Sequence, residues 1–270
     1  KYLDLVAGLA TCSIGHGNKK VAEAVCAQSK KLLNVTNLYY TEQQVVLAKK
    51  LAKISGLSKC FFCNSGAEAN EAAIKLARKH TEKTDIIATK HAFHGRTLGA
   101  LSATWKEKLR KKFEPTVPGF TFVDYNNMQA VEDAITEKTA AVIVEPIQGE
   151  SGIIMPDEDY LVKLKKLCEK KNILLVLDEV QTGTGRTGKF FAYLHYNVKP
   201  DIVTVAKGLA NGIPIGVMMA GKGIDFDKGD HASTFGGNSL SCAAANATID
   251  FIMKNKLMGN AVKRGNYFIK

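Results

Sequence analysis

The chain has 270 residues with an ordinary hydrophobic share of 46%, which is enough to bury the core of one large domain. Its net charge of +11 comes mainly from lysines that are spread along the chain without interleaved aromatic residues, which argues against a nucleic-acid partner and favours anionic small molecules. No apolar run approaches the roughly 20 residues that cross a bilayer, and the chain does not start like a signal peptide, so we expect a cytoplasmic protein with no membrane contact.

The first part of the chain predicts helices joined by loops. Residues 1–17 suggest a short strand-like piece followed by a glycine-rich turn. Asn18 can cap the helix that follows, in which apolar residues recur at helical spacing. After the polar and aromatic loop Asn37–Tyr40, a second amphipathic helix is expected from about Glu42 to Ile54.

From Cys60 onward, short apolar runs alternate with helical patterns. This alternation predicts an α/β fold, with a largely parallel sheet covered by helices on both faces. Cys60 and Cys63 form a C-x-x-C motif, but zinc needs a second ligand pair, so we interpret both as reduced residues of a buried strand. The expected strands are Cys60–Cys63, Asp85–Ala88, Phe120–Val123, Ala140–Val144, Ile173–Leu177, Ile202–Val205 and Val217–Ala220, and the clearest helices are Ala67–His80, Asp157–Lys171 and Ser239–Asn255.

Two of the expected strands end in chemically active residues. Ile173–Leu177 is an unbroken apolar run, as in strands buried on both faces, and it leads into Asp178 and Glu179. The run that starts at Ile202 leads in the same way to Lys207. Ligands of parallel sheets bind beyond the carboxyl ends of the strands, so an acid and a lysine are expected at one edge.

A helix start after the first strand offers a place for an anion. Asn64 and Ser65 are good capping residues, and Glu68 follows Ser65 by three positions, as in a capping box. These residues could simply make a stable helix start. They could also bind a phosphate, because Gly66 lets a ligand approach the backbone and the helix dipole favours an anion.

Further loops carry residues that could contact a ligand. Phe93 could stack on a flat ring, and Arg96 could bind a carboxylate through two hydrogen bonds. The nearby His91 and His94 have no carboxylate at ligand spacing, so no metal is expected there. The loops Glu145–Glu150 and His231–Asn238 could be functional or could be ordinary turns.

The segment from Gly183 to Gly188 imitates a nucleotide-binding motif. It satisfies G-x-G-x-x-G, and it matches a phosphate-binding P-loop as far as Lys189. A P-loop then needs serine or threonine to hold magnesium, and Phe190 stands at that position. We therefore expect a turn held by Arg186, and a P-loop ATPase is kept as an alternative of another class.

The combination of these features is more specific than any one of them. Asp178, Lys207, a phosphate-binding helix start and the stacking ring of Phe93 would all meet at one sheet edge. That set fits an aromatic aldehyde phosphate with a ring nitrogen, which is pyridoxal phosphate. Lysine can form a Schiff base with the aldehyde, and aspartate can pair with the protonated ring nitrogen.

With these residues the chain resembles the class-III aminotransferases, whose large, mostly parallel sheet domain has the aspartate-aminotransferase fold. Asn37–Tyr40 and Phe191–Tyr196 favour the branch that moves the amino group of N-acetylornithine to 2-oxoglutarate in arginine synthesis. Ornithine, 4-aminobutyrate and succinylornithine are alternative donors, and a non-catalytic cofactor-binding protein is a further alternative. The runs that carry the resemblance are Ser65–Asn70, Phe93–Thr97, Glu145–Glu150, Leu177–Gly183, Gly185–Gly188, Lys207–Gly208 and Ser233–Asn238.

The resemblance implies how the cofactor would be held. Lys207 would carry the Schiff base and act as the general base, and Asp178 would pair with the ring nitrogen. Gln181 would approach the phenolic oxygen of the ring, while Val180 and Phe93 would pack on its two faces. The phosphate would be bound by Ser65, Gly66 and Ala67.

The resemblance also implies how the substrate would be bound. Arg96 would bind the α-carboxylate, and Tyr40 and Ser233 would line the substrate pocket. Glu150 resembles a switch residue that masks an arginine of a smaller C-terminal domain. Thr234 would reach the phosphate in the neighbouring subunit, so the protein would be a homodimer with shared active sites.

The same resemblance predicts the organisation of the chain. Residues 1–55 would be an N-terminal segment of helices, and residues 56–255 the large cofactor-binding domain. Residues 256–270 would start the connection to the smaller C-terminal domain. We expect the chain to hold neither that domain nor the further N-terminal segment that family members carry.

Overall fold

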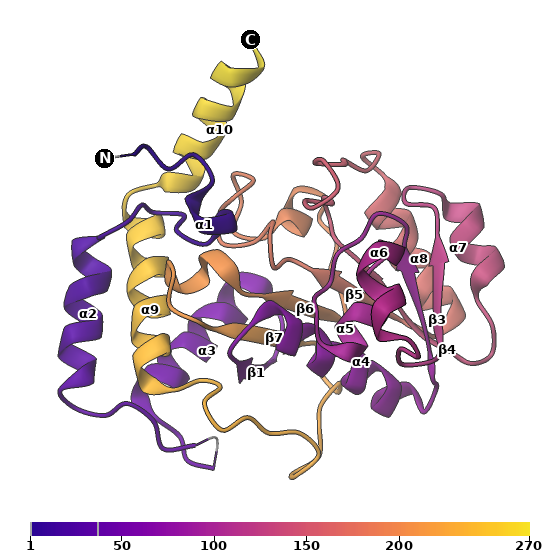
Figure 1. Cartoon of the computed structure of the whole chain (residues 1–270), viewed down its shortest axis with the longest axis horizontal. Helices are drawn as coiled ribbons and strands as arrows, with labels where there is room; N and C mark the ends of the chain where they lie inside the picture. The colour runs from indigo at the N-terminus through magenta and orange to yellow at the C-terminus, as the bar shows by residue number, and fades with distance from the viewer. Residues whose placement is uncertain (1, 37) are drawn as a thin grey trace.

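The protein folds around one seven-stranded sheet with helices on both faces (Figure 1). The computed structural model describes residues 2–36 and 38–270. Two residues therefore lie outside the described ranges: Lys1, and Asn37, which is the first residue of the expected aromatic loop. The strands are arranged in the order β1-β7-β6-β5-β4-β2-β3. No helix in these two ranges is both long and apolar enough to span a membrane.

All seven expected strands are confirmed, each within one residue of its predicted ends. Neighbouring strands from β6 through β5, β4 and β2 to β3 run parallel, whereas β7 is antiparallel to both β1 and β6. The prediction of a largely parallel sheet is therefore confirmed. The strands are β1 (Lys59–Cys63), β2 (Asp85–Thr89), β3 (Phe120–Val123), β4 (Thr139–Val144), β5 (Leu174–Asp178), β6 (Ile202–Val205) and β7 (Gly216–Ala220).

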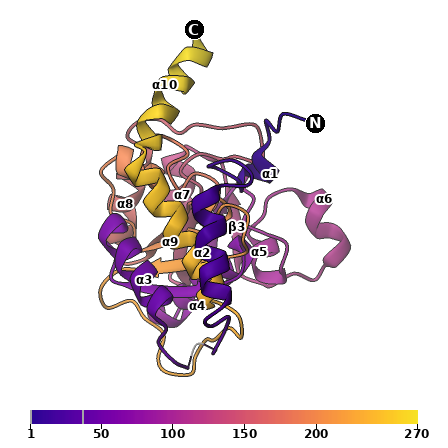
Figure 2. The same cartoon turned by 90° about the vertical axis from the view of Figure 1, so that its left-hand side faces the viewer.

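The expected helices are also present, with Asn18, Ser65 and Asn238 as side-chain caps. α10 projects away from the body of the protein, and none of its residues is buried (Figures 1 and 2). The helices are α1 (Ala7–Ala10), α2 (Lys19–Ser29), α3 (Glu42–Ser55), α4 (Gly66–Thr81), α5 (Leu98–Ser102), α6 (Glu107–Arg110), α7 (Met128–Ala134), α8 (Tyr160–Lys171), α9 (Ser239–Lys254) and α10 (Leu257–Ile269).

The prediction of a short strand-like piece near the N-terminus is wrong. The described part of that segment contains the helical turn α1 and further turns. Asp4 causes the change of direction, because its Oδ1 accepts hydrogen bonds from the backbone N–H groups of Val6 and Ala7 at 2.9 and 2.8 Å. A side chain that binds the backbone in this way competes with strand pairing.

Successive side chains of each strand point to opposite faces of the sheet, so the sheet separates two hydrophobic cores. On β5, Leu175 and Leu177 face the larger core with residues of α3, α8 and α9, while Val176 faces the core formed with α4. Both cores consist of buried apolar side chains, and truncation of a fully buried leucine such as Leu175 to alanine would cost about 2–5 kcal/mol of stability. The sheet edge between the cores is thus held rigidly, which matters for the residues that it positions.

Candidate active site

Five strand ends converge on one cavity of about 240 Å³ at the carboxyl edge of the sheet. The loops after β1, β2, β4, β5 and β6 all contribute to its wall. The antiparallel strand β7 begins at this edge, where Gly216 pairs with Cys63 and lets the backbone of Ser65 pass. The wall consists of Gly66, Ala67, Asn70, Phe93, His94, Gly95, Arg96, Glu145, Glu150, Asp178, Val180, Gln181 and Lys207.

The start of α4 has the expected capping box. Ser65 Oγ accepts a hydrogen bond from the backbone N–H of Glu68 at 3.2 Å, and the Glu68 carboxylate accepts from the backbone N–H of Asn64 at 2.8 Å. The first-turn N–H groups of Gly66 and Ala67 have no partner within a helix, and both residues line the cavity. A stable helix start and a surface for an anion therefore coincide here.

Gly66 is required by close packing against the residue that follows Asp178. A Cβ atom on Gly66 would lie 2.7 Å from Val180 Cγ1, closer than side chains tolerate. Val180 thus covers the helix start and forms part of the cavity wall. Gln181 lies on the adjoining side, against Gly149 of the loop after β4.

Asp178 is 3% exposed at the end of β5, and three donors hold its carboxylate. Oδ1 accepts from the Val180 backbone N–H at 2.9 Å. Oδ2 accepts from Asn70 Nδ2 and from His94 Nδ1, each at 2.7 Å. Three hydrogen bonds on its two oxygens give this buried carboxylate a fixed orientation.

His94 and Glu145 accompany Asp178, although the sequence analysis gave neither residue a role in the site. Burial lowers the pKa of His94, but the hydrogen bond and charge of Asp178 raise it more, so the net pKa lies above the ordinary value. Burial raises the pKa of Glu145 to about 7, and its carboxylate accepts from the backbone N–H groups of Phe93 and Gly149. The position of Glu145 directly after β4 was the available signal, since strand ends meet at this edge.

Lys207 follows β6 in a backbone conformation that lysine rarely adopts. Its φ is +44°, in the left-handed region that is costly for residues with a Cβ atom. Buried neighbours on both sides, Ala206 and Gly208, hold this conformation and direct the residue to the cavity. Strained positions of this kind are concentrated at functional sites.

Phe93, Arg96 and Glu150 form the outer part of the wall. The guanidinium carbon of Arg96 lies 5.6 Å from the centre of the Phe93 ring. Glu150 Oε1 lies 3.9 Å from Lys106 Nζ, and both side chains are about half exposed. The mouth of the cavity thus presents cations and one carboxylate to an incoming ligand.

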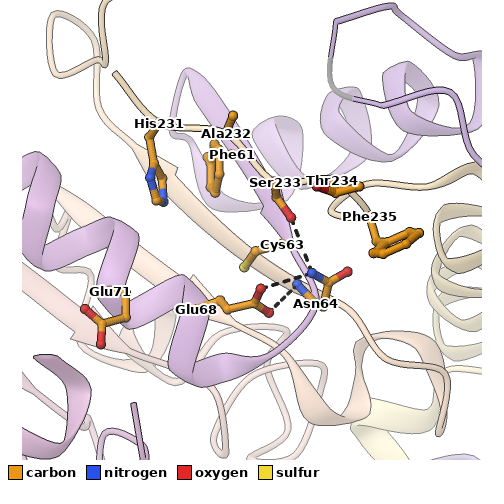
Figure 3. Close-up of a pocket in the computed structure, with 10 residues that line it drawn as sticks. All are labelled: Phe61, Cys63, Asn64, Glu68, Glu71, His231, Ala232, Ser233, Thr234 and Phe235. Carbon is orange, nitrogen blue, oxygen red and sulfur yellow. Dashed lines mark hydrogen bonds between the residues drawn. The ribbon is translucent and has the colours of Figure 1, made fainter. Parts of the chain in front are cut away.

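Four of the expected site residues lie outside this wall. The Ser65 hydroxyl donates to Glu68 at 3.0 Å, and Tyr40 is exposed in a separate hollow beside α3. Ser233 and Thr234 line a larger hollow of about 380 Å³, where Asn64 bridges Glu68 and Ser233 (Figure 3). That hollow contains neither a lysine nor a buried acid, so volume alone does not identify the site.

The glycine-rich segment after β5 forms turns, as expected, and no helix begins at its end. Arg186 Nη2 donates to Ser13 Oγ at 3.0 Å and to the carbonyl of Ala10 at 3.4 Å. Gly188 lies under Val262 of α10. The segment therefore joins the N-terminal turns to α10.

The cysteine motif also has a structural role. Cys60 and Cys63 lie on β1 with free thiols, and burial raises the pKa of both to about 12. Thiols with such pKa values are unreactive near neutral pH. Across residues 2–36 and 38–270, no group of three or more His, Cys, Asp and Glu side chains is arranged to hold a metal.

The cavity fits pyridoxal phosphate by its chemistry. It combines an amine on Lys207, a buried carboxyl group on Asp178, an aromatic face and a helix start with free N–H groups. His94 Nε2 is a further sign, because it is buried in this wall and has no hydrogen-bond partner within the described chain. A buried polar atom without a partner is costly unless a ligand or water supplies one.

Comparisons with known proteins agree with this chemistry. A model of the aminotransferase class-III family matches residues 1–270. The acetylornithine aminotransferase of Methanocaldococcus jannaschii is 49% identical over 278 residues, a match that covers 100% of this chain and 70% of that protein. The acetylornithine aminotransferase of Methanothermobacter thermautotrophicus is 51% identical over 270 residues, a match that covers 99% of this chain and 69% of that protein.

Solved structures give the same result for the fold. The ornithine aminotransferase of Toxoplasma gondii superposes with a TM-score of 0.95 at 35% identity, over 99% of this chain and 66% of that one. A second structure of that enzyme is described with partial occupancy of pyridoxal phosphate at its active site. The chain thus spans about 70% of its curated relatives and about two thirds of this structural neighbour. From the family match over its whole length, the chain belongs to the class-III aminotransferases, which use pyridoxal phosphate.

Proposed function

We propose that the protein moves the amino group of N-acetylornithine to 2-oxoglutarate, as a pyridoxal-phosphate-dependent aminotransferase of arginine synthesis. The observation that carries the proposal is that Lys207 and the buried Asp178 line one cavity at the carboxyl edge of the sheet. The choice of N-acetylornithine rests on relatives of 49–51% identity that bear this activity in their names.

The residues of the cavity would divide the work as follows. Bound pyridoxal phosphate would supply an electron sink for the carbon that bears the transferred amino group, which is the δ-carbon in N-acetylornithine. Lys207 Nζ would remove the proton from that carbon, as a positioned general base and acid. The Asp178 carboxylate would pair with the ring nitrogen, and Phe93 and Val180 would enclose the ring from its two faces.

The outer residues would orient the substrates. The guanidinium of Arg96 suits the carboxylate that lies far from the reacting carbon, which is the α-carboxylate of N-acetylornithine and the distal carboxylate of 2-oxoglutarate. Glu150 would repel the second carboxylate of a dicarboxylate unless a cation screened it, so it is suited to distinguish the two substrates of an exchange. In this protein Lys106 is a cation within 3.9 Å of Glu150.

We also propose a cytoplasmic homodimer in which Thr234 serves the neighbouring subunit and Tyr40 and Ser233 border the substrate. These three residues lie on hollows outside the cavity of their own chain, which a second copy could complete. The proposed divisions of the chain are residues 1–55, 56–255 and 256–270, the last leading to a C-terminal domain. α10 supports this division, because none of its residues is fully buried, although Met258 and Val262 contact the glycine-rich segment after β5.

Amino-donor profiling tests the substrate. We expect kcat/KM for N-acetylornithine to exceed that for ornithine, 4-aminobutyrate and succinylornithine by at least about tenfold, which is about 1.4 kcal/mol of transition-state discrimination. Each donor is tested with 2-oxoglutarate as acceptor, and glutamate formation is measured. A higher kcat/KM for one of the other donors would replace N-acetylornithine as the substrate and leave the aminotransferase class intact.

A further inference from the structure

Asn70 is a polar residue at a place where helix packing calls for an apolar one. It lies in the second turn of α4, among the buried alanines Ala69, Ala72 and Ala73, and is itself 1% exposed. Asparagine is a weaker helix former than alanine, and burial of its amide is unfavourable unless every polar group is paired. Its presence here therefore needs an explanation in the hydrogen bonds that it makes.

The amide of Asn70 joins three parts of the cavity wall to α4. Nδ2 donates to Asp178 Oδ2 at 2.7 Å and to the carbonyl of His94 at 2.7 Å. Oδ1 accepts from Thr204 Oγ1 at 2.8 Å. Thr204 lies on β6, three residues before Lys207, so one side chain links the helix start, the Phe93 loop, the end of β5 and the lysine-bearing strand.

The hydrogen-bond donors are distributed unequally over the two carboxylate oxygens of Asp178, and this fixes which oxygen remains open to a ligand. Oδ2 receives two hydrogen bonds, from Asn70 and His94, whereas Oδ1 receives one from the Val180 backbone N–H. A carboxylate oxygen has two lone pairs, so Oδ1 is the atom with acceptor capacity left for a ligand. Loss of the Asn70 donor would leave Oδ2 with His94 as its remaining donor, so the carboxylate would be less firmly held against rotation about its Cβ–Cγ bond.

We propose that Asn70 is the positioning residue that fixes the Asp178 carboxylate with Oδ1 toward the cofactor ring and holds the phosphate-binding helix in register with it. The inference rests on the proposed cofactor site. It goes beyond that site because Asn70 acts through Asp178, His94 and Thr204.

Replacement of Asn70 tests the proposal by cofactor affinity and by the spectrum of the bound cofactor. We expect N70A to raise the Kd for pyridoxal phosphate by at least about tenfold, as for loss of one hydrogen bond to a charged group. N70D keeps the shape but sets a second carboxyl group against Asp178, so a larger loss is expected, on the order of a hundredfold above neutral pH. The loss in N70D should shrink as pH falls and the introduced carboxyl group takes up a proton.

A structural role alone is separated by a matched control. Asn246 is also a buried asparagine on a helix, and its Nδ2 donates to the backbone carbonyl of Gln43 at 3.0 Å, away from the cavity. N246A should lower the melting temperature of the cofactor-free protein without changing the Kd or the pH dependence of the cofactor spectrum. The milder T204V variant removes only the donor to Asn70 Oδ1, and it should weaken binding about two- to fivefold.

The outcomes decide between the two proposals. If N70A loses stability like N246A but keeps the wild-type Kd and spectrum, Asn70 only supports packing and the inference is wrong. If N70A does not fold, a wild-type Kd and spectrum in T204V would lead to the same conclusion. If the wild-type protein itself does not bind pyridoxal phosphate, the proposed cofactor site fails instead.

Discussion

Two glycine-containing segments follow strands of the same sheet, and only Ser65–Asn70 contributes to the wall of the candidate active site. Ser65–Asn70 opens the 16-residue helix α4 and presents its first N–H groups to a cavity with five strand ends around it. Gly183–Gly188 follows β5 as a series of turns, and Arg186 fastens it to the N-terminal segment. The second segment matches the better-known nucleotide motif, although it has no helix start to bind an anion.

The difference shows that a glycine motif acquires function from what surrounds it. An anion needs several N–H groups that point the same way, and a helix start supplies them together with its dipole. A reactive lysine and a buried acid must also reach the same space, as the ends of β5 and β6 allow here. Substitutions that affect one segment and spare the other can test this contrast.

Gly66→Ala should have the largest effect. The added Cβ would lie 2.7 Å from Val180 Cγ1, so Val180 and the helix start must move apart. We expect the Kd for pyridoxal phosphate to rise by at least about tenfold, with a smaller loss of thermal stability. Titration of the cofactor-free protein with pyridoxal phosphate, followed by absorbance, measures the change.

Gly185→Ala is the matched change in the other segment. Its φ of +85° and the Met258 Cγ atom at 3.1 Å predict a cost of about 1–2 kcal/mol in stability. Cofactor affinity should stay at the wild-type value. Equal losses of affinity in both alanine variants would remove the distinction between the segments.

Glu179→Gln should have an effect of intermediate size, which appears in the pH dependence of the free energy of unfolding. Burial raises the pKa of Glu179 to about 7, so between about pH 4.5 and 7 the folded chain binds more protons than the unfolded chain. Stability therefore falls as pH rises through this window, by at most about 1.4 kcal/mol per pH unit for this group. Glu179→Gln should flatten that slope, as measured by denaturant unfolding from pH 4.5 to 8.

Glu145, whose pKa burial also raises to about 7, contributes a slope of the same sign, so the Glu179→Gln variant should keep part of it. The Glu179 carboxylate accepts hydrogen bonds from the backbone N–H of Tyr193 and from the Thr182 hydroxyl, and neither of these two residues lines the cavity. Cofactor affinity at fixed pH should accordingly remain unchanged in this variant. An unaltered slope would mean that the buried Glu179 does not titrate in this range.

Arg186→Ala should have the smallest effect. The variant loses the hydrogen bonds to Ser13 and Ala10, which are exposed, so we expect a loss of about 1 kcal/mol or less. Differential scanning calorimetry should detect a drop of a few degrees in the melting temperature with transamination unaffected. Loss of transamination without a change in stability would instead assign a catalytic role to the glycine-rich turn.

The sequence predicted the sheet well because buried strands and amphipathic helices carry strong local patterns. Asp178 and Lys207 were found for the same reason, since each directly follows an apolar run. The polar layer behind them was not found, because nothing in the order of residues indicates that Asn70 and His94 meet Asp178, or that Thr204 meets Asn70, in space. An asparagine inside an alanine-rich helix was the one local signal of that layer.

Other predictions depend on contacts that a single chain does not contain. Tyr40, Ser233 and Thr234 lie on hollows away from the cavity, and the resemblance assigns them roles that stay predictions. The prediction of a strand-like piece near the N-terminus failed because the side chain of Asp4 accepts hydrogen bonds from the backbone and turns the chain. Local apolar character cannot reveal such a competing hydrogen bond.

The most direct test of the account is to trap the cofactor on its lysine. Protein incubated with pyridoxal phosphate is reduced with borohydride, digested and mapped by mass spectrometry, with Lys189→Ala as the control in the glycine-rich turn. We expect a visible absorption band that reduction abolishes and a pyridoxyl group on Lys207, in the wild type and in the control but not in Lys207→Ala. Labelling of another lysine, or an unchanged band in Lys207→Ala, would contradict it.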